Sequence, residues 1–468
     1  FPALPGSCRC LCLLWRPWPM ETSAENFLVS LDTIRSAYLQ LQREGYITLS
    51  QNVGSTVIKD YKEQEIEQNV QLFFSARKSA LIDLSKSLCP LFVHAQWTGL
   101  KNAPADIYSS MKMRQEQQGL QPFAAFKHII PAYASLGNDL LIRLLWQVYM
   151  FFEAPFLCVP HNPWYEFAVH EFAPQTLKLC LRQDWDSLRS LIYRAKDDLS
   201  VSLCEFYDSR ITLVSQEELP FVWSPYQKAS QICYSLAMDL LVEISLGRYP
   251  VHTLLPSLNK LSLERGVSVS TVRRALSLLN GVGAVKSVKR VGTRVLPFQE
   301  TAENCDFTKP AVRKRLVDMA QSLQLLALSC KSVSQLTVQA LDAEGIQKGM
   351  AMLAAAEERQ QYQLIAYNAL ELLRQFAPYQ AIRTVYGKLL QQFFWGYSLR
   401  SMWKAGGDRR DFYISCYEAL VHSLKAADSA LFSEKLEELM IHEFRLTVFH
   451  LVQLGIVEAQ RLLIPEIT

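Results

Sequence analysis

Hydroxyl and basic side chains are interspersed with apolar ones between Val267 and Leu296, in the run VSVSTVRRALSLLNGVGAVKSVKRVGTRVL. Hydroxyl, guanidinium and ammonium groups are the side-chain donors that bind phosphate oxygens and base edges of DNA. The candidate contacts are Ser268, Ser270, Thr271, Arg273, Arg274, Lys289, Arg290 and Gly292. Their types and spacing predict a surface that binds double-stranded DNA.

A helix must position the first five of these residues. Apolar residues recur there at helical spacings and can share one buried face, namely Val267, Val272, Ala275, Leu276 and Leu279. Ser268 and Ser270 stand where an N-cap belongs, and Gly281 and Gly283 end the helix. The opposite face then carries the arginines toward a DNA groove.

A β-hairpin must position the remaining three. Valines at 285, 288, 291 and 295 form two short β-rich runs. Lys289, Arg290 and Gly292 lie at the turn between them and give it a basic tip. A helix followed by such a hairpin suits a groove and its flanking phosphates.

The same pattern occurs earlier in the chain, from Val29 to Ile58. Val29 aligns with Val267 without a gap, a shift of 238 residues, and ten positions are identical. The counterparts of the candidate contacts are Ser30, Thr33, Arg35 and Gly54. A match over thirty positions with so long a period predicts an internal duplication of domains rather than a solenoid.

The charge of the whole chain is nearly neutral, +3 over 468 residues, so any DNA surface must come from local clustering. The second copy is clustered: nine basic residues and one acid lie between Gly247 and Leu296. In the first copy, Arg35 and Arg43 are offset by Asp32 and Glu44. The alternative interpretation of the basic run is a solvated face.

Several functional classes are disfavoured. The eleven cysteines include no C-x-x-C pair, which argues for a reducing cytosol and against a disulfide framework or a zinc site. No G-x-S-x-G, GK[ST] or H-E-x-x-H signature of an enzyme appears, and no cofactor is predicted. The apolar run from Leu144 to Phe152 is too short to span a bilayer and predicts a buried helix, with no membrane partner.

The predicted fold class is mainly α, with two winged helix-turn-helix units that are each followed by an all-helical domain. The predicted domains are 1–60 for a degenerate or truncated winged unit, 61–215 for an effector-like helical domain, 216–225 for a linker, 226–297 for the second winged unit and 298–468 for a second helical domain. Residues Phe1–Met20 crowd cysteine, tryptophan and proline together, and Phe1 stands where a start codon would give Met. We therefore expect the first winged unit to lack its opening helix and to carry an insert in place of its second helix.

Helical spacing of apolar residues predicts five further helices. They are Glu65–Leu88, Phe123–Ile130, Leu140–Phe152, Leu177–Leu203 and Tyr226–Gly247. The last of these would open the second winged unit. A further helix would start at Leu255-Pro256-Ser257, directly before the one that begins near Val267.

The run GRYP…LLPSLNKLSLERGVSVSTVRRALSLLNGVGAVKSVKRVGTRVL resembles the winged helix-turn-helix of GntR-type bacterial transcription regulators. The resemblance covers Gln231–Leu296 well and Val29–Ile58 for the second half only. It implies that the recognition helix and wing contact DNA, and that a helical domain binds a small-molecule effector and dimerises. The chain departs from the family where arginines are usual, at Asn259, Val269 and Leu31.

The resemblance also implies a candidate metal site, because some effector domains of the family hold a metal through Asp and His. Asp318, His422 and His442 are the most plausible trio here, although ordinary surface or core histidines are the favoured interpretation. An apolar effector cavity is a second expectation, with plain core as the favoured alternative. Its candidate aromatic residues are Trp146, Tyr149, Phe151, Phe152, Phe393, Phe394, Trp395 and Tyr397.

Two winged units in one chain predict a pseudo-dimer on DNA, or otherwise a homodimer, in the cytoplasm of a bacterium. The unequal charge of the copies predicts an asymmetric site at which the second copy supplies most of the affinity. The rival class is a helical sensor or interaction protein whose winged units are vestigial. Salt dependence of DNA binding separates these two hypotheses.

Overall fold

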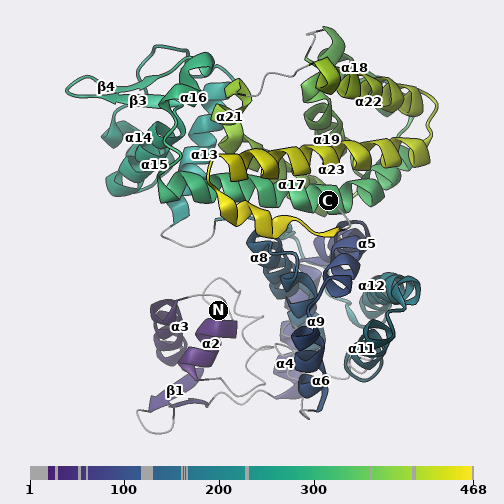
Figure 1. Cartoon of the computed structure of the whole chain (residues 1–468). Coiled ribbons are helices and arrows are strands. Elements are labelled where there is room, and N and C mark those ends of the chain that lie inside the picture. Colours follow the sequence, from purple (N-terminus) through teal and green to yellow (C-terminus); the bar gives the residue numbers. More distant parts are fainter. Residues whose placement is uncertain are drawn as a thin grey trace. The chain divides into compact units, whose positions relative to one another are not determined.

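The computed structural model describes residues 19–26, 30–50, 54–58, 62–116, 130–159, 162, 164, 167–226, 231–358, 361–402 and 407–465. The structure is 76% helical, and its described strands form two antiparallel two-stranded sheets (Figure 1). The predicted fold class, mainly α with small hairpin wings, is confirmed. The predicted helix Phe123–Ile130 lies outside the described residues except for Ile130.

The chain divides into two compact units. The first comprises Phe1–Cys89, Gln96–Ser135 and Leu145–Phe221, and the second comprises Pro90–Ala95, Leu136–Leu144 and Val222–Thr468. The last change from the first unit to the second falls between Phe221 and Val222, in an irregular stretch that contains the predicted linker. Phe221 and Trp223 on either side of this point are both buried.

The first unit begins with two helices and a hairpin: α2 (Met20–Asn26), α3 (Leu31–Arg43), β1 (Ile47–Ser50) and β2 (Gly54–Val57). α3 starts where it does because the Oγ of Ser30 accepts the backbone N–H of Thr33 at 3.2 Å, the N-cap hydrogen bond. Gly45 follows the helix with φ of +77°, a left-handed conformation that turns the chain into β1. The buried face of α3 is Ile34, Ala37, Tyr38 and Leu41.

Helices continue through the rest of the first 210 residues. They are α4 (Glu63–Ser75), α5 (Lys78–Lys101), α6 (Ala105–Glu116), α8 (Asp139–Val148), the π-helix η1 (Tyr149–Glu153), α9 (Ala154–Leu157), the π-helix η2 (Phe167–Phe172), α11 (Ala173–Arg182) and α12 (Trp185–Arg210). Two predicted single helices are each divided, which corrects the prediction. Glu65–Leu88 breaks before Arg77, whose Nη1 donates to the carbonyl of Phe73 at 3.1 Å, and Leu177–Leu203 breaks at Gln183, where φ is +55°.

The apolar run around Leu144–Phe152 is divided among α8, η1 and α9. The stretch Asp139–Leu157 is long and apolar enough to cross a membrane, with a mean hydropathy of 1.4. Within the protein, 61% of its most apolar window is buried. Such burial is typical of a core helix.

The second unit contains a winged segment built from three helices and a hairpin. These are α13 (Ile232–Ser245), α14 (Leu258–Arg265), α15 (Val269–Val282), β3 (Val285–Val288) and β4 (Gly292–Val295). α13 and α14 both pack against α15. The backbone N–H of Leu255 donates to the carbonyl of Thr293 at 2.8 Å, and that of Val295 donates to Thr253 at 2.9 Å. The segment before α14 therefore lies beside β4, joined to it by an isolated antiparallel bridge between Leu254 and Arg294.

The remaining helices of the second unit include one long, largely buried helix, α17. They are the 3₁₀-helix η4 (Phe298–Glu300), α16 (Thr301–Asn304), α17 (Pro310–Ala340), α18 (Ala343–Glu358), η5 (Tyr362–Leu364), α19 (Ile365–Phe376), α20 (Gln380–Gln392), η6 (Phe393–Gly396), α21 (Tyr397–Met402), α22 (Gly407–Lys425), α23 (Ser429–Gln453) and η7 (Val457–Leu462). Every residue of α17 from Arg315 to Cys330 is buried. α23 runs beside it and makes its most extensive contact, so these two helices form the centre of the core (Figure 1).

The two hairpins have the same register at the shift of 238 residues. Ile47 pairs with Val57 in the first, and Val285 pairs with Val295 in the second. The correspondence extends to the helix before each hairpin, because Ser30 and Ser268 both cap a helix and accept the N–H three residues later. Two segments of unequal composition thus adopt the same local structure.

The expected insert before α3 lies outside the described residues as far as Trp18, but the structure shows a helix, α2, in its last part. α2 occupies the place of that insert and aligns with α14 at the same shift. Its buried Ser23 shares a 2.7 Å hydrogen bond with the hydroxyl of Tyr38. The aligned residues of the second copy are Leu261 and Leu276, which are also buried. A hydrogen-bonded Ser–Tyr pair stands where the aligned segment has two leucines, so α2 lacks the apolar pattern that would predict it.

Candidate nucleic-acid interface

The sequence around Ser268 fixes the first turn of α15. Ser268 Oγ accepts the backbone N–H of Thr271 at 3.2 Å and lies 2.8 Å from Ser270 Oγ. The N-cap is therefore Ser268, one of the two serines predicted for it, while Ser270 lies in the first turn with its side chain exposed. Arg273 and Arg274 are exposed one turn further on, and Thr271 is half-buried.

One face of α15 is buried, so the hydroxyl and basic side chains on the opposite face are directed outward. The buried face consists of Val272, Ala275, Leu276, Leu278, Leu279, Gly281 and Val282. The helix before it ends at Gly266, whose φ of +61° allows the tight turn into α15, and Ser262 Oγ donates to the carbonyl of Val267 across that turn. α14 and α15 thus form a helix-turn-helix with a fixed angle between them.

The wing carries the second group of basic side chains. Lys289, Arg290 and Val291 form the turn between β3 and β4, and all three are exposed. Arg290 has φ of +64° and Gly292 has φ of +140°, so the tight turn uses conformations that most residues avoid. The predicted turn with a basic tip is confirmed.

Three basic residues of this segment pair with acidic side chains, of which Lys260 lies 3.8 Å from Glu264. Arg265 Nη2 lies 2.6 Å from Glu243 Oε2, and Arg248 Nη1 lies 3.5 Å from Glu243 Oε1. The hydrogen bond with Glu243 raises the pKa of Arg265. Glu243 on α13 thus fixes α14 and neutralises part of the local charge. Glu243 was not predicted from the sequence because it precedes the basic segment.

The exposed basic surface therefore consists of six residues on α15 and the hairpin. They are Arg273, Arg274, Lys286, Lys289, Arg290 and Arg294. In the parts of the chain that the structure describes, Arg273 and the four hairpin residues form no ion pair. An α-helix of this kind fits the major groove of B-DNA, and a cationic hairpin beside it can reach flanking phosphates.

The helix α3 and the hairpin β1–β2 have the same local structure as α15 and β3–β4, with a different surface. Ser30, Thr33, Arg35 and Gly54 are exposed at the positions that the alignment predicts. Arg35 lies 3.7 Å from Asp32 in an exposed ion pair. Asp32 aligns with Ser270, so a carboxylate occupies the first turn of this helix.

The loss of positive charge extends over the rest of the first copy. Ser36 aligns with Arg274, Thr48 with Lys286 and Thr56 with Arg294. Of the six basic positions of the second copy, Arg35 is the one that remains basic in the first. The two aligned segments thus differ in surface charge, whereas their serine-capped helices and hairpin registers agree.

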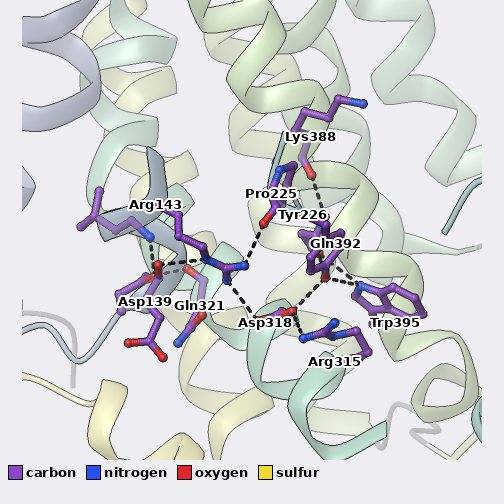
Figure 2. A network of polar contacts seen from close by, with 12 residues as sticks. Asp139, Arg143, Pro225, Tyr226, Arg315, Asp318, Gln321, Lys388, Gln392 and Trp395 are labelled. Carbon is purple, nitrogen blue, oxygen red and sulfur yellow. Dashed lines mark hydrogen bonds and ion pairs between the residues drawn. The ribbon is translucent and has the colours of Figure 1, made fainter. Parts of the chain in front are cut away.

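The proposed metal trio does not assemble. No group of three metal-binding side chains occurs among the described residues. Asp318 instead lies against two guanidinium groups, 2.8 Å from Arg315 and 3.4 Å from Arg143 (Figure 2). His442 packs on the ring of Phe412 with centroids 4.2 Å apart. Several partners of the Asp318 carboxylate are distant in sequence, and no local spacing of residues predicts them.

The aromatic residues that were expected to line a cavity pack in separate places. Trp146 stacks on Tyr149 within the first unit, with centroids 6.4 Å apart. In the second unit Tyr397 contacts Phe298 edge-on, and Trp395 is fully buried. These contacts are those of core side chains.

One segment of the chain matches a known family. Residues 235–295 match the family described as "Bacterial regulatory proteins, gntR family". This segment is a GntR-family helix-turn-helix domain. It begins within α13, includes α14 and α15, and ends at the last residue of β4.

Solved structures of GntR proteins are also similar to parts of the chain. A GntR protein of Streptococcus agalactiae is 15% identical over 45% of this chain and 98% of its own length, with a TM-score of 0.22. E. coli McbR/YncC is 15% identical over 47% and 98%, with a TM-score of 0.25. A GntR family member from Pseudomonas syringae is 20% identical over 48% and 89%, with a TM-score of 0.22. No curated protein sequence matches the chain.

Proposed function

We propose that this chain is a sequence-specific DNA-binding transcription regulator of a bacterial cytoplasm. The observation that carries the proposal is the exposed basic surface of the GntR-family segment, on which α15 and the hairpin present six cations. Ser268, Ser270, Thr271 and Arg273 occupy the first turns of α15, where side chains reach base edges and phosphates. Arg274 lies beside them on the same helix.

The hairpin supplies the second part of the proposed contact. Lys289 and Arg290 extend from its tip, and Gly292 allows the turn that directs them. Contacts to phosphates fix the register of a protein on DNA, whereas base contacts provide its specificity. We therefore assign positioning to the hairpin and sequence recognition to the exposed face of α15.

We further propose that one chain carries two DNA-binding units and acts as a pseudo-dimer. What supports this proposal is the common hairpin register, the common serine caps and the alignment of α2 with α14. Ser30, Thr33, Arg35 and Gly54 would form the first contact surface. Asp32 on that surface repels phosphate, so the site on DNA would be asymmetric and the second unit would supply most of the affinity. A homodimer of such chains is the alternative assembly.

The organisation into domains stays part of this proposal. Residues 1–60 and 226–297 would form the two winged units, and residues 61–215 and 298–468 would form helical domains joined through the linker 216–225. One or both helical domains would bind a small-molecule effector that alters DNA affinity. No cofactor or catalytic step is part of this function.

The test is selection of duplexes from a random library by the whole chain, followed by affinity measurement and footprinting. Exchange of both Arg273 and Arg274 for Glu should lower affinity at least about tenfold, since a base contact contributes about 1–3 kcal/mol. Arg35→Glu should have a smaller effect, and Lys348→Glu on α18 is the matched control outside both winged units. Unequal half-sites are expected in the footprint, whereas equal palindromic half-sites would contradict the asymmetry. If no sequence is selected and binding does not depend on salt, the winged units are vestigial and the helical sensor hypothesis replaces this proposal.

A further inference from the structure

The hairpin of the GntR-family segment is joined to α15 at a point close to its tip. Oδ1 of Asn280, in the last turn of α15, accepts the backbone N–H of Ser287 on β3 at 3.2 Å. Ser287 stands two residues before Lys289, which together with Arg290 forms the tip cations of the hairpin. One side chain of α15 thus reaches the strand that leads into the tip cations.

The strand that receives this hydrogen bond is the edge strand of the hairpin. β4 pairs with β3 on one side, and no described strand pairs with it on the other. N–H groups on such an open edge have no partner within the sheet. The side chain of Asn280 accepts one of them instead. Since Asn is a weaker helix former than most residues, we attribute its place in α15 to this contact rather than to the helix.

Other hydrogen bonds hold the base and the opposite edge of the hairpin. At the base, the backbone N–H of Leu296 donates to the carbonyl of Ala284 at 3.0 Å. On the opposite edge, the N–H of Leu255 donates to the carbonyl of Thr293, the residue that pairs with Ser287 across the sheet. These bonds fix the hairpin on the segment before α14, and they do not involve α15. The bond to β3 completes the support on the side of that helix.

The first copy lacks this support. Gln42 and Leu49 stand at the positions of Asn280 and Ser287. Within the described part of the chain, Gln42 is exposed and its side chain forms no hydrogen bond with β1. The hydrogen bond at the base of the hairpin is present in both copies. The two hairpins therefore share a register, but the second alone among the described segments is bonded in this way to the helix before it.

We propose that Asn280 is a positioning residue of the DNA interface, which sets the distance from the exposed arginines of α15 to the tip cations. One duplex engages both groups only if this distance suits the path from a groove to its flanking phosphates. A hairpin that is already fixed loses little conformational freedom on binding. Asn280 is neutral and acts through the hairpin rather than through contact with DNA. This inference rests on the proposed function and gives the second copy an advantage in affinity besides its charge.

The test is a double-mutant cycle between Asn280 and the tip cations, measured as the affinity of the whole chain for the selected duplex. Asn280→Leu keeps the size of the side chain and removes its acceptor. It should lower affinity about fivefold, since one neutral hydrogen bond favours the bonded placement of the hairpin by about that factor. In a chain that also carries Lys289→Ala and Arg290→Ala, the same exchange should change affinity by less than about twofold, because no tip cation remains to be positioned.

A merely structural role of Asn280 predicts a different result. If Asn280→Leu weakened α15 or the whole fold, it would lower affinity by the same factor with and without the tip cations. Equal losses in the two backgrounds, or no loss in the unmodified chain, would overturn the proposal. Asn69→Leu on α4 is the matched control, because Asn69 Nδ2 also donates to the backbone, to the carbonyl of Glu65 at 2.7 Å, and this exchange should leave affinity unchanged.

A second variant removes the same hydrogen bond from its other side and serves if Asn280→Leu fails to fold. Ser287→Pro lacks the donor, and an edge strand tolerates proline where its N–H points away from the neighbouring strand. The expected loss of affinity is again about fivefold, and it should again vanish when the tip cations are absent. A loss that persists without the tip cations would contradict the proposal for this variant as well.

Hydrogen exchange of the free chain separates this inference from the proposed function. The hairpin should exchange faster in Asn280→Leu than in the unmodified chain, whereas Asn280→Asp keeps an acceptor at Oδ1 and should keep the slower exchange. If no duplex is selected but exchange responds in this way, the proposed function is refuted while the attachment of the hairpin is confirmed. If a duplex binds and neither affinity nor exchange responds to Asn280→Leu, the positioning role alone is refuted.

Discussion

The number of cations that touch DNA can be measured through the dependence of affinity on salt. Each phosphate that a protein neutralises contributes about −0.9 to the slope of log affinity against log salt concentration. The second winged segment exposes six basic side chains, on α15 and the hairpin. If all six lie on phosphates, the slope is about −5, and affinity falls about 10³-fold between roughly 50 and 200 mM salt.

The perturbation that tests this reasoning is the exchange of Lys289 and Arg290 for Ala. Both lie at the exposed hairpin tip, where their loss leaves the buried face of α15 untouched. Two fewer contacts should move the slope from about −5 to between −3 and −4. The fall in affinity over the same range of salt would then be about 10²-fold.

Fluorescence anisotropy with a labelled duplex measures these slopes, and a duplex of arbitrary sequence suffices because phosphate contacts do not depend on sequence. Arg35→Ala, at the equivalent helix of the first copy, should change the slope by no more than about one unit. Lys348→Ala on α18 should leave it unchanged. An unchanged slope in the hairpin variant would refute the assignment of the hairpin to phosphate.

Two other predictions concern stability. Gly283→Ala should destabilise the chain by more than about 2 kcal/mol, because its φ is +82° and a Cβ there would lie 2.3 Å from the carbonyl oxygen of Thr301. Gly45→Ala, with φ of +77° and open space around it, should be destabilising by only about 1–2 kcal/mol, and equal losses in urea unfolding would contradict this reasoning. The hydrogen bond from Arg210 lowers the pKa of Glu67, so this carboxylate stabilises the fold above the ordinary pKa of Glu and loses that effect as pH falls through its folded value. Glu67→Gln should therefore be less stable than the unmodified chain at pH 7 and converge with it as the pH falls below the lowered pKa of Glu67, whereas a constant difference across this range would exclude the ion pair as its cause.

Local signals in the sequence were sufficient to predict the helix and the hairpin of the candidate interface. The helix α15 follows from a serine cap, apolar residues at helical spacing and a glycine end, all within one stretch of about 15 residues. The hairpin follows from four valines in two short β-rich runs with Gly292 at the turn between them, whereas its register comes from the structure. Each of these signals acts between neighbours in the chain, so a single sequence is sufficient to reveal them.

Helix ends and a helix that lack such signals were not predicted. Neither Pro nor Gly marks the ends of α4 at Ser75 or of α11 at Arg182, and the apolar pattern continues across both breaks. α2 was missed because Ser23 and Tyr38 occupy positions where the aligned segment has leucines, and they form a hydrogen bond over 15 residues of sequence. The spacing of apolar residues does not reveal a buried pair of polar residues.

The sequence by itself determined the helix α15, its hairpin and the unequal charge of the two aligned segments, because these depend on residue type and short spacing. Only the tertiary structure decided what Arg315 does. In the sequence it follows Arg313 and Lys314 and belongs to an ordinary basic run. In the fold, Tyr226, Tyr234 and Asp318 surround it, because the rotation of α17 about its axis and the packing of α13 against the helical core select one of three adjacent cations for burial.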